Sequence, residues 1–257
     1  MIVRAEGRCG PAPFTPIPSQ PESLPPVCAR GGLSHPGAEE RESCIATLTV
    51  VGVGIGLRSM SAALQRHSLG ATWIEQGSMS RTAHALLSDG RVWLIDPFDD
   101  VAALQAASAL DPPAGVLQLL DRHNRDCEAI ATRLAVPLLR LPERVPDTPF
   151  EVVPVLSRTR WREVALWWPQ TRALIIPEAI GTAPAFALGR RAGVHPMLRL
   201  TPPRSQLSGY EPSMLLVGHG RTLESEAAAA LGDALARSRS DIPRLLVRLP
   251  SLMRGRD

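Results

Sequence analysis

The chain has 257 residues, 44% of them hydrophobic, and its 28 basic residues are all arginine and give a net charge of +3. This length can bury one substantial core, whereas 4% aromatic residues and the lack of a basic stripe argue against a nucleic-acid partner. The longest apolar run has about 13 residues, fewer than the ~20 of a membrane span, so we expect a cytoplasmic protein with no membrane partner.

Residues 1–45 are rich in proline and poor in apolar residues, as in the stretch "PAPFTPIPSQPESLPPV". Proline removes backbone donors and restricts its neighbour, so this composition predicts a disordered extension and neither helix nor sheet. Residues 46–71 are expected to be a linker or a poorly defined lead-in, and residues 72–257 to be one domain.

The lead-in contains an apolar run followed by Gly52, Gly54 and Gly56. Glycines between a strand and a helix let the backbone approach a pyrophosphate, so nucleotide binding is one hypothesis for this stretch. The spacing G-x-G-x-G differs from G-x-G-x-x-G, and no acidic residue ends a second strand about 20 residues further on. A linker or an irregular strand therefore fits the stretch better.

From residue 72 onward, apolar runs alternate with turn and helix signals. The segments "TWIEQG", "RTAHALL" and "RVWLIDP" predict strands, with a hairpin at the pair Asp89-Gly90. The segment "DDVAALQAASAL" has helical spacing and can be capped by Asp99 or Asp100. "AGVLQLLD" and "VPLLRL" predict further strands, on either side of a helix in "RDCEAIATRLA".

The second half of the chain is richer in strands. "FEVVPVL", "REVALWWP" and "RALIIPEA" form a β-rich run broken by turns, and "PSMLLVGHG" predicts a strand that ends at a histidine between glycines. A long helix is expected in "TLESEAAAALGDALARSRS", and "DIPRLLVRL" is a candidate for another. This order of elements predicts a layered α/β protein.

The order of these features resembles that of the metallo-β-lactamase fold superfamily. The corresponding family features are a strand ending in I-D-P, a T-H-x-H-x-D-H motif, a P-G-H turn, a G-D pair after a hairpin strand and a closing G-H-G. Here "LIDP" and "VGHG" match, and "DRHNRDC" stands in place of the central motif. The resemblance covers about residues 72–240 and implies a four-layer αββα sandwich, preceded here by the disordered extension.

The central motif can be placed on this sequence in two registers. In the first, His123 takes the second histidine, Asp121 the first, Arg125 the aspartate and Asp126 the last histidine. The other register moves Asp126 onto the aspartate and leaves an arginine, an asparagine and a cysteine at the histidine positions. The first register is favoured because it keeps three side chains there that can bind a metal.

Outside that motif, Thr159 falls at the histidine of the P-G-H turn, Glu178 at the bridging aspartate and His219 at the histidine of G-H-G. The resemblance implies a hydrolase in which a metal activates water to cleave ester, thioester or phosphoester bonds. His123, Asp126, Glu178 and His219 would bind one divalent ion, Zn, Mn or Fe, and carboxylate-rich ligation favours the harder ions.

Asp121 and Arg125 are the catalytic candidates. Asp121 would help to hold the ion, and an arginine would stabilise the developing anion. Arg125 also adds positive charge where a second metal ion would lie, which argues against two ions. Asp121 could instead cap the following helix, and structural roles are expected for His84 and His195.

The same residues are compatible with a protein that has no catalytic activity. The alternative is a metal-free binding module on the same fold, in which arginines at the mouth of the site bind an anionic ligand. These arginines are Arg122, Arg125, Arg158, Arg160 and Arg162, although a lysine-free composition alone could explain them. The expected partner is therefore a small-molecule substrate or an anionic ligand.

Overall fold

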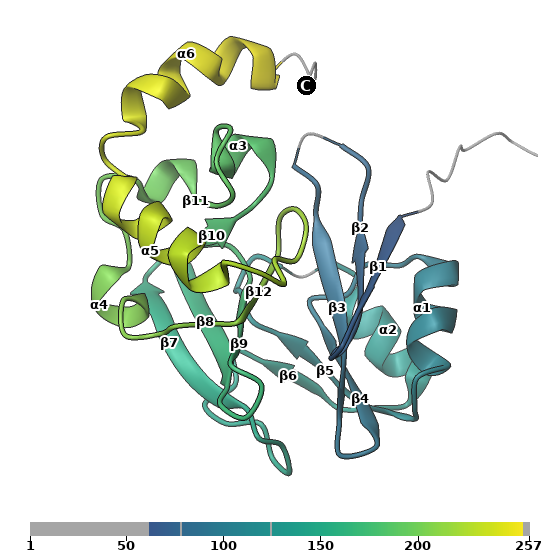
Figure 1. The fold of residues 1–257 in the computed structure, drawn as a ribbon. Coiled ribbons are helices and arrows are strands. Elements are labelled where there is room, and N and C mark those ends of the chain that lie inside the picture. The colour runs from purple at the N-terminus through teal and green to yellow at the C-terminus, as the bar shows by residue number, and fades with distance from the viewer. Residues whose placement is uncertain (1–61, 78, 124, 254–257) are drawn as a thin grey trace, which may run out of the picture. The chain divides into compact units, whose positions relative to one another are not determined.

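The computed structural model describes residues 62–77, 79–123 and 125–253, all of which lie in one compact unit of residues 56–257 (Figure 1). The disordered extension expected over residues 1–45 and the glycine stretch of residues 52–56 lie outside the described residues. Both therefore stay predictions.

The first half of the described chain forms a six-stranded sheet with the order β1-β2-β3-β4-β5-β6. Its strands are β1 (Ala63–His67), β2 (Gly70–Ile74), β3 (Thr82–Ser88), β4 (Arg91–Ile95), β5 (Pro113–Gln118) and β6 (Leu138–Arg140). The strands from β1 to β4 pair antiparallel, whereas β4, β5 and β6 run parallel. The parallel part requires crossovers, which are α1 (Val101–Ser108) and α2 (Cys127–Leu134).

Two local predictions for this half are confirmed. Asp89 and Gly90 have φ angles of +50° and +69° and close the β3–β4 hairpin, as a two-residue type I′ turn requires. Asp100 caps α1, because its Oδ1 accepts a hydrogen bond from the Ala103 N–H at 2.8 Å.

The sheet begins before residue 72, where the sequence places the start of the domain. β1 and the start of β2 lie in the stretch 46–71 that the sequence assigns to a lead-in. β1 is an edge strand, and its sequence "ALQRH" leaves most of its side chains exposed or half-buried. Edge strands keep polar side chains, so no apolar run reveals this strand in the sequence.

The second half forms a four-stranded sheet of described residues with the order β12-β9-β8-β7. Its strands are β7 (Glu151–Arg158), β8 (Trp161–Trp168), β9 (Ala173–Ile176) and β12 (Met214–Val217). β12 pairs parallel with β9, so both strands end at the same edge of the sheet. The remaining elements are β10 (Ile180–Gly181), α3 (Pro184–Ala187), β11 (Gly193–Val194), η1 (Pro196–Leu198), α4 (Arg204–Leu207), α5 (Ala227–Arg237) and α6 (Ile242–Met253).

The two sheets pack face to face. Ile95 and Leu117 of the first sheet share a buried cluster with Leu166 and Ile175 of the second. The opposite face of the first sheet packs against α1 and α2, and the opposite face of the second packs against α5 (Figure 1). The four-layer αββα sandwich expected from the sequence is therefore confirmed.

Candidate metal centre

Four polar side chains follow the carboxyl ends of strands from both sheets. Asp96 follows β4 and His123 follows β5, while Glu178 follows β9 and His219 follows β12. β4 and β5 are parallel neighbours, and so are β9 and β12. Each pair of loops therefore leaves its sheet at one edge, where layered α/β proteins tend to form ligand sites.

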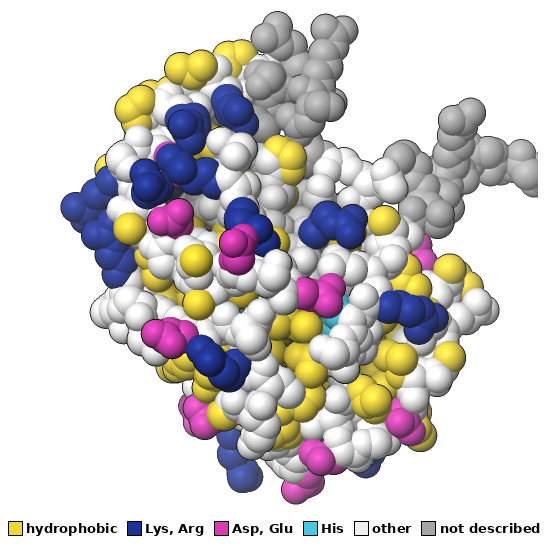
Figure 2. All heavy atoms as spheres, in the orientation of Figure 1, with side chains coloured by type: hydrophobic (Ala, Val, Ile, Leu, Met, Phe, Trp, Pro, Cys, Tyr) yellow, Lys and Arg dark blue, Asp and Glu magenta, His cyan; other side chains and the backbone are white. Residues whose placement is uncertain are grey.

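His123, Glu178 and His219 bring three ligand-type atoms together. Glu178 Oε2 lies 2.9 Å from His123 Nε2 and 3.0 Å from His219 Nε2, and the ligand atoms of the three residues lie within 4.8 Å of one another. All three residues are buried, and the face drawn in Figure 2 shows only a small area of histidine. Two imidazoles and a carboxylate are ligands that zinc, manganese and iron accept, so the group could hold a divalent ion.

Both histidines of this group turn their other ring nitrogen toward an acceptor. His219 Nδ1 lies 2.8 Å from the Met79 carbonyl oxygen, which can only accept, so this nitrogen carries a proton. His123 Nδ1 lies 3.2 Å from Asp96 Oδ2, close enough for an ion pair but not aligned as a regular hydrogen bond. Metal-binding histidines show the same pattern, which leaves Nε2 free for the ion.

The Glu178 carboxylate is the electrostatic centre of the group. Its Oε1 lies 3.2 Å from His195 Nε2, so three imidazoles surround the two carboxylate oxygens. Burial acts to raise the pKa of Glu178, but hydrogen bonds from His123, His195 and His219 hold it well below its usual range. Burial and Arg125 act to lower the pKa of His123, but the Asp96 and Glu178 carboxylates outweigh them and raise it.

A second carboxylate, that of Glu163 in β8, lies beneath the loop that bears Glu178. It accepts hydrogen bonds from the N–H groups of Glu178 (3.0 Å) and Ala179 (2.7 Å) and from the Trp161 indole (3.0 Å). Burial raises the pKa of Glu163 to about 7, although these three donors act in the opposite direction. The loop after β9 is therefore tied to β8 by hydrogen bonds.

Arg125 lies beside the cluster and binds backbone groups from three strand ends. Its Nη1 donates to the carbonyl oxygens of Thr82 (2.7 Å) and Asp96 (2.8 Å). Its Nη2 lies 3.4 Å from the Gly218 carbonyl oxygen and 3.4 Å from His123 Nε2. Burial lowers the pKa of Arg125, but a guanidinium stays charged in proteins. The residue thus places a fixed positive charge next to the ligand group.

Structural comparison finds solved structures to which this chain is similar. VMB-1 is 10% identical with a TM-score of 0.52, and the match covers 70% of this chain and 97% of that chain. A metallo-β-lactamase from Pontibacter korlensis is 13% identical, with a TM-score of 0.47 and coverage of 68% and 99%. The DIM-1 metallo-β-lactamase is 15% identical, with a TM-score of 0.46 and coverage of 70% and 96%.

The chain has the metallo-β-lactamase fold. At identities of 10–15% the likeness describes the fold and not the activity. No protein-family model and no curated protein sequence matches this chain.

Three residues that the sequence places at the metal site of this fold lie apart from the ligand group. Asp121 Oδ2 accepts a hydrogen bond from the Arg162 N–H at 2.9 Å, on the side of β8. Asp126 is exposed, and its Oδ2 accepts a hydrogen bond from the Asp99 N–H at 2.8 Å. Thr159 is exposed in the turn between β7 and β8. In the turn after β5 the His123 N–H donates to the Leu120 carbonyl oxygen. His123 points to the ligand group from this turn, whereas the carboxylates of Asp121 and Asp126 bond to backbone N–H groups elsewhere.

His84 has the structural environment that the sequence predicts. Its Nδ1 lies 2.7 Å from Thr72 Oγ1, and its Nε2 lies 3.1 Å from the Val217 carbonyl oxygen. Burial lowers the pKa of His84 to about 3, so the ring is neutral and its Nε2–H donates to that carbonyl. The contact joins β3 to the end of β12, directly before the glycine and histidine of "VGHG".

The sequence did not predict a role at the metal site for three residues that contact the ligand group. They are Asp96, Glu163 and His195. The alternation of β8 could have revealed Glu163, because it places the carboxylate on the same face as the buried Trp161 and Ala165. His195 stands before a proline in an irregular stretch, where no periodicity indicates its direction.

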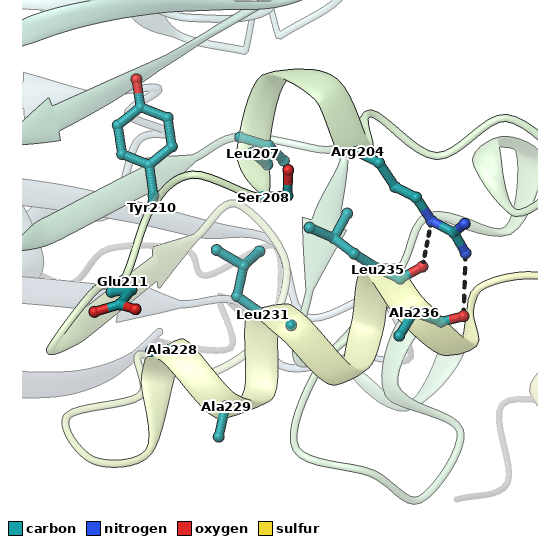
Figure 3. A pocket seen from close by; sticks show the side chains of 11 residues that line it. Arg204, Leu207, Ser208, Tyr210, Glu211, Ala228, Ala229, Leu231, Leu235 and Ala236 are labelled. Atoms are coloured by element: carbon teal, nitrogen blue, oxygen red, sulfur yellow. Dashed lines mark hydrogen bonds between the residues drawn. The ribbon is translucent and has the colours of Figure 1, made fainter.

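A groove of about 660 Å³ lies away from this site, between α4, the loop after it and α5. Its walls are mainly apolar, with Leu207, Tyr210, Leu231 and Leu235 among them (Figure 3). Arg204 donates hydrogen bonds to the carbonyl oxygens of Leu235 (3.0 Å) and Ala236 (3.1 Å), and its guanidinium is therefore engaged. The residues that line the groove include the carboxylate of Glu211 but no histidine, so the groove lacks the imidazole ligands of the cluster.

Within the described residues, no helix combines the length and the apolar composition that crossing a membrane would need.

Proposed function

We propose that this protein binds one divalent metal ion through His123, Glu178 and His219 and hydrolyses ester, thioester or phosphoester bonds. The observation behind the proposal is the convergence of the two Nε2 atoms on Glu178 Oε2. Both rings are turned this way by acceptors at Nδ1, as metal-binding histidines are. A bound divalent ion lowers the pKa of coordinated water and polarises the bond to be cleaved.

The chemistry of the donor set favours one ion. Three protein ligands leave further coordination positions for water and substrate, which is typical of catalytic metal sites. The Arg125 guanidinium, 3.4 Å from His123 Nε2, opposes a second cation by charge repulsion. Zinc, manganese and iron all accept this combination of imidazole and carboxylate, so the ligands alone do not select among them.

The residues around the ligands would orient them and neutralise charge. Asp96 holds the Nδ1 side of His123, and the Met79 carbonyl holds the Nδ1 side of His219. Arg125 has both Nη atoms occupied by backbone carbonyls, so its positive charge acts through space on an anionic substrate. The proposed substrate is a small molecule with an acyl or phosphoryl group.

A metal-free binding module is the second candidate function. It is favoured by the distances around Glu178, which are those of direct hydrogen bonds to imidazoles, so the carboxylate already has partners in the absence of an ion. Such a protein would use its positive charge to bind an anionic ligand without converting it.

Metal content of the purified, untagged protein distinguishes the two. After growth in medium supplemented with zinc, manganese and iron, elemental mass spectrometry should find about one equivalent of metal, as expected for a three-ligand site. H219A and E178Q should lose this metal. D126N is the matched control, because Asp126 bonds outside the cluster, and it should retain the metal.

A wild-type protein without metal would support the binding module. If metal is present, the loaded protein is then tested against aryl esters, thioesters and phosphodiesters. Turnover that disappears in H219A and persists in D126N would support the hydrolase, whereas equal turnover in both variants would indicate a contaminant.

A further inference from the structure

The backbone at Glu178 is held by a second buried carboxylate. Glu163 Oε1 accepts hydrogen bonds from the N–H groups of Glu178 (3.0 Å) and Ala179 (2.7 Å), and Glu163 Oε2 accepts one from Trp161 Nε1 (3.0 Å). Glu163 is 1% exposed, and a carboxylate at such a depth is tolerated only where donors replace water. Glu163 therefore fixes two successive peptide groups at the point where Glu178 leaves the end of β9.

The side chain of Glu178 is held from another direction by His195. His195 Nδ1 accepts a hydrogen bond from the Met197 N–H at 3.1 Å, so the neutral ring has its proton on Nε2. This Nε2 lies 3.2 Å from Glu178 Oε1 and can donate to it. Oε1 is thus engaged, and Oε2 is the oxygen that faces His123 and His219.

Trp161 links these two contacts. Its indole donates to Glu163, and its ring packs edge-on against His195 with centroids 4.9 Å apart at 88°. Phe186 also packs edge-on against His195, at 5.2 Å and 76°. Two aromatic rings therefore confine the imidazole and limit its rotamers.

From these contacts we infer that Glu163 and His195 are positioning residues that present Oε2 of Glu178 to the metal ion. The inference rests on the proposed function, because it assigns a task at the same site. The terminal torsion of a glutamate is broad, so the plane of an unheld carboxylate would rotate away from the orientation that points one oxygen at the ligand group. Partners outside the ligand set typically change metal affinity by about 10–100-fold.

The first test compares E163Q with the wild-type protein and with E151Q. Glutamine keeps the shape of the side chain, but its amide group must face either the Trp161 indole or the backbone N–H groups, donor against donor. Glu151 is an exposed carboxylate on the neighbouring strand β7, so E151Q makes the same chemical change without these contacts. We expect E163Q to weaken Zn²⁺ binding by about 10–100-fold and to alter the visible spectrum of bound Co²⁺. E151Q should do neither.

A second pair of variants isolates the donor on His195. In H195N the shorter side chain can still accept from the Met197 N–H but lacks the ring. In H195F the ring between Trp161 and Phe186 is kept, but no N–H remains. Both variants lose the imidazole Nε2–H that faces Glu178, and a similar weakening of Zn²⁺ binding in both, by about tenfold or more, assigns the effect to that N–H group. These variants also test the inference if E163Q does not fold.

I175V is the control for a general loss of stability. It removes a methyl group from the buried layer between the sheets and leaves the contacts of Glu178 in place. If E163Q and both His195 variants lower the Tm but bind Zn²⁺ and Co²⁺ as the wild type does, the roles are structural and the inference is overturned. If the wild type itself binds no metal, the proposed function fails, and the contacts are tested in the metal-free protein by ¹⁵N NMR of the imidazoles. Ring signals of His123 and His219 that shift in E163Q and H195F support the positioning of Glu178, and unchanged signals contradict it.

Discussion

Asp96 and His123 follow two parallel strands, and Asp96 Oδ2 lies 3.2 Å from His123 Nδ1. The other oxygen of Asp96 accepts a hydrogen bond from the Leu119 N–H at 3.0 Å, so the carboxylate is fixed from behind. Asp96 has a φ of +44°, which is uncommon for a non-glycine residue and typical of functional sites. The contact favours a proton on Nδ1 and leaves His123 Nε2 directed at Glu178.

The substitution D96N tests this contact. An amide either donates to His123 Nδ1 or accepts from it more weakly than a carboxylate, so Zn²⁺ affinity should fall by about 10–100-fold, as measured by competition with a chelating dye. D121N is the control, because Asp121 bonds to a backbone N–H outside the cluster. Equal affinities of D96N and the wild type would show that Asp96 does not orient the ligand.

Removing the charge of Arg125 should move stability and metal affinity in opposite directions. R125M leaves the carbonyl groups of Thr82 and Asp96 without these donors, so the free energy of unfolding should fall by about 3 kcal/mol. Loss of the nearby positive charge should strengthen Zn²⁺ binding several-fold. R140M removes an exposed arginine and should change stability by less than about 0.5 kcal/mol. A parallel loss of stability and affinity would mean that Arg125 acts only by supporting the shape of the site.

His84 should make the folded state sensitive to acid. Burial lowers its folded-state pKa to about 3 from a reference of 6.5, with smaller contributions from the positive charges of His67 and Arg125. Between these values the unfolded state binds more protons, so this contribution is complete above pH 6.5 and is lost as the pH falls. The free energy of unfolding should decrease by about 1.4 kcal/mol per pH unit from this group.

Urea unfolding of the wild type and H84Q at pH 7.5, 6.5 and 5.5 measures the contribution of His84. It is the difference between the two proteins in how steeply the free energy of unfolding changes with pH. Glutamine does not titrate, so H84Q should have the shallower dependence on pH. Identical slopes would show that the buried ring is not the group responsible.

Gly218 is required by a close approach between two loops. A Cβ at this position would lie 1.9 Å from the Pro177 carbonyl oxygen. G218A must therefore push the segment that bears His219 away from the segment that bears Glu178. We expect the free energy of unfolding to fall by about 3 kcal/mol and Zn²⁺ binding to weaken with it. G232A is the matched control: a Cβ on Gly232 in α5 meets nothing within 4 Å, and alanine should stabilise the helix by about 0.5–1 kcal/mol.

Much of the fold could be predicted from the sequence because its signals are local. The Asp89-Gly90 turn, the Asp100 cap and the buried strands are set by residues that are close in the chain. β1 escaped prediction because an edge strand needs no apolar run. The family resemblance carried by "LIDP" and "VGHG" predicted that Glu178 and His219 share a site, and the parallel pairing of β9 with β12 brings the ends of their strands together.

The site itself was only partly predictable. His123, Glu178 and His219 were named from the sequence and come together in the structure. Asp121 and Asp126 are near His123 in the chain, but the turn after β5 directs their carboxylates to backbone N–H groups of other elements. Such directions depend on tertiary contacts, which spacing in the sequence does not determine.

The parallel pairing of β9 with β12 joins two strands that are far apart in the chain. Asp96 and His123 leave the ribosome with the first sheet, whereas Glu178 and His219 belong to strands that follow later. A nascent chain that ends before His219 can contain Glu178 but lacks the last residue of the ligand group. The proposed metal site is therefore complete only after β12 has been synthesised and has paired with β9.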